Sequence, residues 1–138
     1  MAATQSELVV ITNAKRLADY VFIITQKSPK HFRLTLTNRM QNYALDIIES
    51  LYAANDVYIT KDDPTASGKR LRYQHHALTC LRLLSYMGEL AQGPDVQCIL
   101  PKQFEEMSKR IAECHNTLLG WVASDKRRLT QTNNPNGR

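Results

Sequence analysis

The feature that most constrains the fold is an apolar stripe in the last third of the 138-residue chain. Its members recur every three or four positions: Phe104, Met107, Ile111, Cys114, Leu118, Trp121 and Val122. This spacing lines one face of a helix, and such a face is stable only when other elements cover it. Pro101 suits the first helical turn, where no backbone N–H is needed. The pattern therefore predicts a long helix from Pro101 that packs against other helices.

Three further segments show the same helical periodicity, and we expect helices over residues 8–26, 37–55 and 70–91. Ser28-Pro29 ends the first, because the residue before a proline avoids helical geometry. Residues 30–33 are expected to form a basic linker or a single turn. A loop is expected over 60–68, where Asp, Pro, Ser and Gly cluster. Gly93-Pro94 ends the third helix.

Four helices joined by short connections favour an all-α fold, an antiparallel up-down four-helix bundle. We expect one domain over residues 1–129 and a polar, disordered tail over residues 130–138. The predicted core includes Leu17, Tyr43, Ile47, Leu84, Met87, Phe104, Ile111 and Trp121.

Composition and motifs narrow the functional classes. The chain carries 18 Lys and Arg against 13 Asp and Glu, a formal net charge of +5, which favours an acidic partner such as nucleic acid. No apolar run approaches the length of a membrane span, and the three cysteines form no disulfide framework, so a cytoplasmic location is expected. Phosphate loops, nucleophile elbows and zinc-binding motifs are missing. We therefore expect no catalytic residues, no metal and no cofactor.

The helix over residues 70–91 has a second face that carries charge. Arg72, His75 and Arg82 follow one line, with Glu89 as the acidic residue on that face and Leu83 and Leu90 interleaved. One interpretation is a core helix with a solvated charged face. The other is a helix that packs inward and also contacts a partner.

The second interpretation defines the candidate contact residues for nucleic acid or a polymerase. They are Lys69, Arg70, Arg72, His75 and Arg82. A secondary basic patch comprises Lys15, Arg16, Arg39, Lys126, Arg127 and Arg128. Phosphate attracts Lys and Arg without requiring a fixed spacing, so the signal is unspecific.

Two long stretches resemble a known family. They are residues 17–55, with KSPK, TLTNR and QNYALDI, and residues 100–127, with GW-x-x-SDKR. Both resemble the accessory variability determinant (Avd) proteins of diversity-generating retroelements. The wider relatives of that family are four-helix-bundle proteins encoded in intervening sequences of 23S ribosomal RNA genes.

The resemblance implies a small basic four-helix bundle that assembles as a pentameric barrel. It also implies binding to a reverse transcriptase and to template-repeat RNA, and support for mutagenic cDNA synthesis without catalysis by the accessory protein. It transfers no individual contact residue. Two alternatives stay open: a stand-alone RNA-binding bundle of the intervening-sequence type, and a structural homo-oligomer without nucleic acid.

Overall fold

The computed structural model describes residues 5–133 of the chain, with side chains from Val9 to Thr130. Over this range the chain is helical apart from its connections. The elements are α1 (Gln5–Ile24), α2 (Lys30–Phe32), the π-helical segment η2 (Arg33–Thr37), α3 (Asn38–Asp56), α4 (Pro64–Ala91) and α5 (Pro101–Asn133). None of the described helices is both long and apolar enough to cross a membrane.

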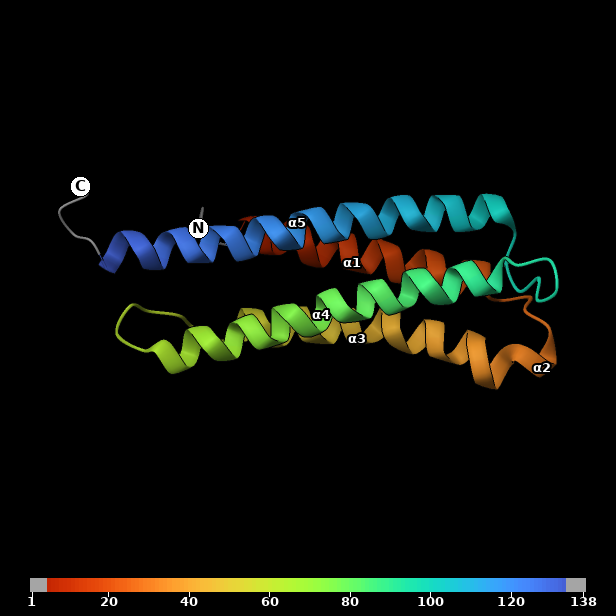
Figure 1. The fold of residues 1–138 in the computed structure, drawn as a ribbon, viewed down its shortest axis with the longest axis horizontal. Helices are drawn as coiled ribbons and strands as arrows, with labels where there is room; N and C mark the ends of the chain where they lie inside the picture. Colours follow the sequence, from red (N-terminus) through yellow and green to blue (C-terminus); the bar gives the residue numbers. More distant parts are fainter. Residues whose placement is uncertain (1–4, 134–138) are drawn as a thin grey trace.

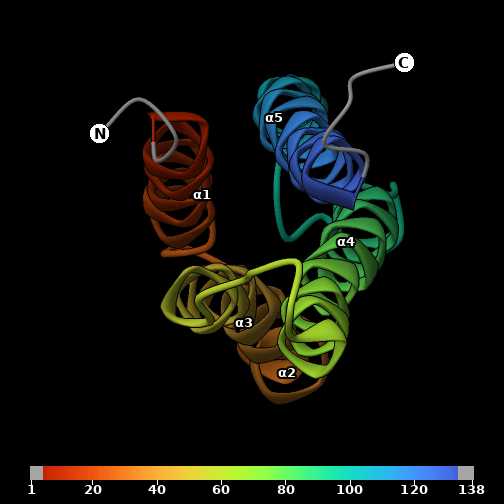
Figure 2. The same ribbon diagram turned by 90° about the vertical axis from the view of Figure 1, so that its left-hand side faces the viewer.

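The four long helices form an antiparallel up-down bundle, which confirms the predicted fold class (Figure 1). Seen from the end, they follow one another around a ring in chain order, so that α5 closes the ring beside α1 (Figure 2). Neighbouring helices in this ring pack against each other, whereas α1 and α3 lie diagonally opposite α4 and α5, respectively.

The core runs along the axis of the bundle. Leu17, Ile47, Leu84 and Trp121 each contribute a fully buried side chain, one from each long helix. Ile111 is also buried, while Tyr43, Met87 and Phe104 are partly buried and pack against the core. The predicted core residues are thus all inside or at its margin, because each helix places its three- and four-residue repeat toward the axis.

The start of α4 differs from the sequence prediction. The expected loop over residues 60–68 ends at Asp63, and the helix begins at Pro64. The Asp63 carboxylate accepts a hydrogen bond from the Ala66 backbone N–H at 3.2 Å, and Pro64 occupies the first turn. An Asp cap followed by proline is a helix-start signal. It outweighs the turn propensity of Ser67 and Gly68.

The connection from α1 to α3 is more ordered than expected. A single helical turn, α2, leads into η2, whose backbone bonds are those of a π-helix. Thr37, directly before α3, has helical geometry and makes no side-chain cap bond. Short π-helical insertions often occur where a helix is adjusted for packing or function.

The end of α5 also differs from the prediction. The helix continues through Asn133, so the expected tail from residue 130 is wrong for its first four residues. The remaining predicted tail, residues 134–138, lies outside the described residues. In Figure 1 the end of α5 projects beyond the end of α3. Lys126, Arg127 and Arg128 lie in the part of α5 near this end of the bundle.

Candidate nucleic-acid interface

One end of the bundle brings the start of α4 together with the end of α5. The two helices are antiparallel neighbours, so residues far apart in sequence meet here. A small hollow of about 170 Å³ lies between them. Its lining includes Gly68 and Leu71 from α4 and Val122 and Lys126 from α5. Two of the basic clusters identified in the sequence are therefore parts of one region.

A buried ion pair joins the two helices beneath this surface. The guanidinium of Arg70 contacts both carboxylate oxygens of Asp125, with Nε–Oδ2 at 2.9 Å and Nη2–Oδ1 at 3.0 Å. Gln74 donates a further hydrogen bond to Asp125 at 3.0 Å, and the guanidinium lies 4.7 Å from the Trp121 ring centroid. Of the two contacts, the one from Nη2 has hydrogen-bond geometry, and together with the charge pairing and the Gln74 bond it holds the partners in place.

The same arginine fixes the connection between α3 and α4. Its Nη1 donates to the Val57 backbone carbonyl at 3.2 Å. The next residue, Tyr58, is 82% exposed. An aromatic ring is thereby displayed to solvent from a backbone that is anchored to the buried ion pair. Aromatic rings presented in this way are platforms on which nucleotide bases stack.

Exposed cations lie at the same end of the bundle as this ring. Lys69 and Lys126 directly flank the two members of the ion pair in sequence, and Arg127 is exposed on the following position of α5. Arg128 is half-buried and lies 3.6 Å from the Asp125 carboxylate. We call this region the Tyr58 end, defined by Tyr58, Lys69, Lys126 and Arg127. Acidic residues also occur in the connection, at Asp62 and Asp63, and Asp63 serves as the helix cap.

The placement of Arg70 corrects the sequence prediction. It was expected to contact nucleic acid or a polymerase, but it is only 5% exposed and is paired inside the bundle. A signal was present, since Arg70 precedes the buried Ala77 and Leu84 by seven and fourteen residues and so shares their stripe. Asp125 follows Leu118 by seven residues in the same way. Opposite charges on two core stripes at the same end of the bundle indicate a buried pair.

Arg72 is exposed but is not surrounded by cations alone. It lines a groove of about 440 Å³ between α3 and α4 together with Asp46, Glu49 and His76. On α4 itself, Glu89 is the acidic residue on the face that carries Arg72, whereas Asp46 and Glu49 come from α3. The two α3 carboxylates reduce the positive potential around Arg72, which makes it a weaker candidate for phosphate than Lys69.

His75 and Arg82 lie further along α4, and both are exposed. The apolar residues interleaved with them are also partly in solvent: Leu83 is 39% exposed and Leu90 41%, with Tyr86 at 58%. The predicted line therefore extends along the outside of α4 rather than forming one compact cluster. Its basic head belongs to the Tyr58 end, and its remainder is mixed apolar and basic.

The secondary basic patch is divided over the molecule. Lys15 of α1 lies 5.3 Å from the ring centroid of Tyr52 on α3. Arg39 donates to the Tyr43 hydroxyl at 2.9 Å near the start of α3, at the end of the bundle opposite Lys69. Only Lys126, Arg127 and Arg128 are brought next to the start of α4.

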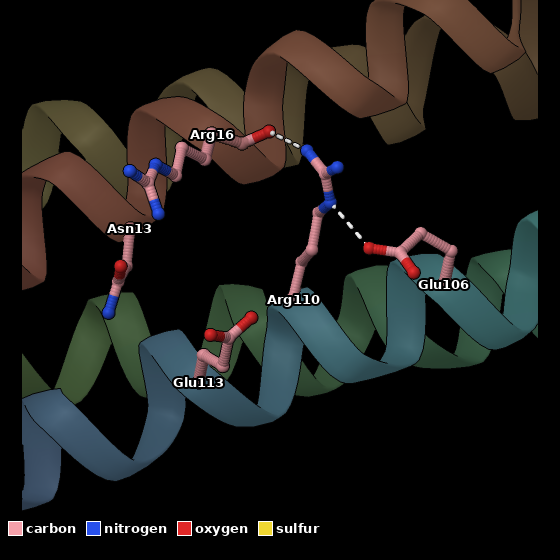
Figure 3. Close-up of a pocket in the computed structure, with 5 residues that line it drawn as sticks. All are labelled: Asn13, Arg16, Glu106, Arg110 and Glu113. Atoms are coloured by element: carbon pink, nitrogen blue, oxygen red, sulfur yellow. Dashed lines mark hydrogen bonds and ion pairs between the residues drawn. The ribbon is translucent and has the colours of Figure 1, made fainter.

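Arg16 faces a polar groove between α1 and α5, shown in Figure 3. Opposite it on α5 stand Glu106, Arg110 and Glu113, around a volume of about 300 Å³. Arg110 pairs with Glu106 at 2.9 Å and donates to the Arg16 backbone carbonyl at 3.2 Å. Because acidic and basic groups alternate here, this groove has no net preference for phosphate.

The Arg110 guanidinium also lies over the ring of Tyr20, 4.5 Å from its centroid. Burial raises the pKa of the Tyr20 hydroxyl, the Glu106 carboxylate raises it further, and Arg110 opposes the rise. This phenol stays protonated and neutral around pH 7, so it adds no negative charge to the groove.

The three thiols are buried and show no sign of activation. Burial raises the pKa of Cys80 and of Cys98, and raises that of Cys114 to about 12. A reactive cysteine needs a lowered pKa, so these act as small apolar side chains. Among the described residues, no group of three or more His, Cys, Asp and Glu side chains is arranged to hold a metal ion.

Comparison with known proteins adds no assignment. The chain matches no protein-family model, no curated protein and no solved structure. The functional argument therefore rests on the residues of the chain and on their arrangement in the bundle.

Proposed function

We propose that this chain is a non-catalytic accessory protein of a diversity-generating retroelement, which acts in the cytoplasm. It binds the element's reverse transcriptase and its template-repeat RNA and supports mutagenic cDNA synthesis. The partners come from the resemblance of residues 17–55 and 100–127 to the Avd family. The four-helix bundle is compatible with that resemblance, and the Tyr58 end offers a surface suited to RNA.

The observation that carries the RNA-binding part is the combination of an exposed ring with exposed cations. Tyr58 is exposed at the end of the bundle that also carries the exposed Lys69, Lys126 and Arg127, and the Val57 carbonyl before it accepts a hydrogen bond from the buried Arg70. Cations bind phosphates of any sequence, and an aromatic ring stacks on any base. This combination favours single-stranded or unpaired RNA and predicts little sequence preference.

The test measures RNA affinity against salt concentration, with template-repeat RNA as the probe. Lys69→Glu with Lys126→Glu should lower the salt slope by about 1.4 units, since each lost phosphate contact on a single strand contributes about 0.7. Tyr58→Ala should weaken binding by about 1–3 kcal/mol with the slope unchanged. Lys15→Glu, on α1, is the matched control and should have a small effect. Equal binding by the wild type and the double variant would overturn the assignment of the Tyr58 end.

The polymerase part is tested by co-purification with the reverse transcriptase of the same element. A complex that survives at moderate salt supports the accessory role. RNA binding without any polymerase complex would favour the stand-alone RNA-binding alternative of the intervening-sequence type. The absence of both would favour the structural homo-oligomer.

We further propose that the protein assembles as a ring-like homo-oligomer with five subunits. The number comes from the resemblance, and the support from the structure is the partly exposed row of Leu83, Tyr86 and Leu90 on α4. Apolar surface of this kind is often covered by another subunit. Light scattering should give about five times the 15.8 kDa of one chain. A mass of one chain at micromolar concentration would exclude the ring.

A further inference from the structure

The end of the bundle opposite Tyr58 contains a hollow of about 380 Å³. On one side it is lined by Ile23 at the end of α1 and by Gln26 and Lys27 in the turn that follows. On the other side lies the connection from α4 to α5, which supplies Gln97 and Leu100. Gln103, in the first turn of α5, also lines the hollow. We call this region the α2 end, because α2 lies at the same extremity of the bundle (Figure 1).

The walls of this hollow are held by backbone hydrogen bonds. The N–H groups of Cys98 and Ile99 both donate to the Ala91 carbonyl, at 2.8 and 3.2 Å. The Leu100 N–H donates to the Gln103 side-chain oxygen at 2.8 Å, which fixes the first turn of α5. The hollow is therefore a preformed feature of the connection.

Gln97, in the connection from α4 to α5, has a strained backbone conformation. Its φ is 50°, and it is the one non-glycine residue with positive φ among those described. A glycine would adopt this conformation without the steric penalty of a Cβ. A non-glycine residue held in this region often marks a functional position. Here the glutamine side chain lines the hollow.

The exposed apolar residues of this hollow are aliphatic. Ile23 is 60% exposed and Leu100 is 63% exposed, and they stand on the two elements that form its walls. Exposed aliphatic side chains around a preformed hollow are typical of protein interfaces, where a side chain of the partner fills the space. The Tyr58 end differs in that its most exposed large side chain is an aromatic ring.

The charges around the hollow indicate the sign of the partner. Lys27 is in the lining, and Lys102 is adjacent to Gln103 in α5. Arg33 of η2 donates to the Ser28 carbonyl at 3.1 Å, which brings a third cation to this end. The lining itself contains no carboxylate among the described residues, and the acidic residues nearest to it in the chain, Asp95 and Glu105, lie outside the lining. A partner segment that carries acidic residues would complement this arrangement.

We propose that the α2 end is the docking surface for the polymerase, through an acidic segment that places an apolar side chain in the hollow between Ile23 and Leu100. This inference rests on the proposed function for the existence of the polymerase partner. It adds the surface, the chemistry of the contact, and a division of the molecule into an RNA-binding end and a protein-binding end.

The experiment uses the full chain and the reverse transcriptase of the same element as the probe. Ile23→Asp with Leu100→Asp should weaken polymerase binding by about tenfold or more, as expected for the loss of central apolar contacts. Affinity for template-repeat RNA and helicity should stay at wild-type values. Leu119→Asp is the matched control, because Leu119 is a 44% exposed leucine of α5 that does not line the hollow.

A second double variant distinguishes a loss of polymerase binding from a loss of folding. Lys27→Glu with Lys102→Glu leaves the apolar residues intact and should weaken polymerase binding mainly through a slower association rate. Wild-type affinity in both double variants would overturn the inference and leave the proposed function standing. Loss of RNA binding, or a fall in oligomer mass, with polymerase affinity unchanged would also overturn it. A wild-type chain that binds no polymerase would overturn the proposed function itself.

Discussion

The two ends of the bundle both carry exposed cations, but they differ in what accompanies those cations. At the Tyr58 end an exposed aromatic ring follows Val57, whose carbonyl accepts a hydrogen bond from Arg70 of the buried Arg70–Asp125 pair. At the α2 end, two aliphatic residues border a preformed hollow, and backbone bonds hold its walls. Net charge alone does not distinguish the ends. The neighbouring side chains do, since rings stack on bases whereas aliphatic groups fill protein interfaces.

The two ends also differ in the contacts that stabilise them. The Tyr58 end depends on a few strong polar contacts in the interior, so the loss of one partner leaves a buried charge. The α2 end depends on close packing and on a strained loop residue. We therefore expect the largest effects of mutation at the Tyr58 end, and smaller ones of either sign at the α2 end.

The largest expected effect is that of Arg70→Ala. The substitution leaves the Asp125 carboxylate buried without its main partner, which typically costs about 3–5 kcal/mol of unfolding free energy. Arg110→Ala is the control, because the Arg110–Glu106 pair is about one-third exposed and such pairs contribute about 1 kcal/mol or less. Urea unfolding followed by circular dichroism measures both. A loss below that of Arg110→Ala would show that the buried pair does not stabilise this end.

An intermediate effect is expected for Gly88→Ala, near the α2 end. A Cβ here would overlap Met107 Cε and lie 3.0 Å from Phe104 Cδ1, so the buried Met107 side chain would have to change conformation and Phe104 would have to shift. Overpacking of this kind typically costs about 1–3 kcal/mol, and the higher helix propensity of alanine offsets part of it.

Gly120→Ala is the matched substitution within a helix. A Cβ at Gly120 would meet nothing within 4 Å. Only the gain in helix propensity remains, so this variant should be more stable by about 0.5–1 kcal/mol. The melting temperatures of the two variants should shift in opposite directions. A gain in stability for Gly88→Ala as large as that for Gly120→Ala would show that α4 and α5 are not tightly packed there.

A smaller effect of opposite sign is expected for Gln97→Gly. It removes the steric cost of the positive φ, and we expect a gain of up to about 1 kcal/mol in unfolding free energy. The same variant should bind the polymerase more weakly, because the side chain that lines the hollow is lost. Denaturant unfolding and polymerase affinity, measured on the same preparation, check the two halves. A loss of stability would mean that the glutamine is held there for packing.

The thiols have little effect on stability at neutral pH and become important only at high pH. An unfolded cysteine loses its proton near pH 9.0, whereas folded Cys114 loses it near pH 12. The folded state binds more protons between these values, so stability falls as the pH rises from about 9 toward 12. Cys98 lies in the α4–α5 connection and Cys114 in the middle of α5. Mass spectrometry after brief alkylation at pH 9 should find Cys98 modified first, and the reverse order would indicate a looser core than loop.

The sequence analysis was most successful where a local rule decides the outcome. Pro101 begins α5, and α4 ends at Ala91 before Gly93-Pro94, as expected. It failed at Pro64, where the Asp63 cap was present in the sequence but the turn residues were given more weight. It also failed at Thr130, because polarity alone does not end a helix.

The candidate site was less accessible to sequence analysis. Arg70 was grouped with its charged neighbours, although its spacing from Ala77 and Leu84 placed it on the buried stripe. Arg72 was judged against Glu89 on its own helix, whereas Asp46 and Glu49 come from α3. Tyr58 was overlooked, since its role depends on the bond between the Val57 carbonyl and Arg70 across thirteen residues.

By itself, the sequence determined the four helices, the faces that they bury and the positive charge, because periodicity and composition are properties of the local chain. The tertiary structure decided which charges meet. Antiparallel packing brings Arg70 to Asp125 and puts Lys69 and Lys126 at the same end of the bundle, while Arg39 lies at the opposite end. The electrostatic environment of a side chain depends on neighbours from other helices. Helix order around the ring therefore separated the two ends of this bundle into different surfaces.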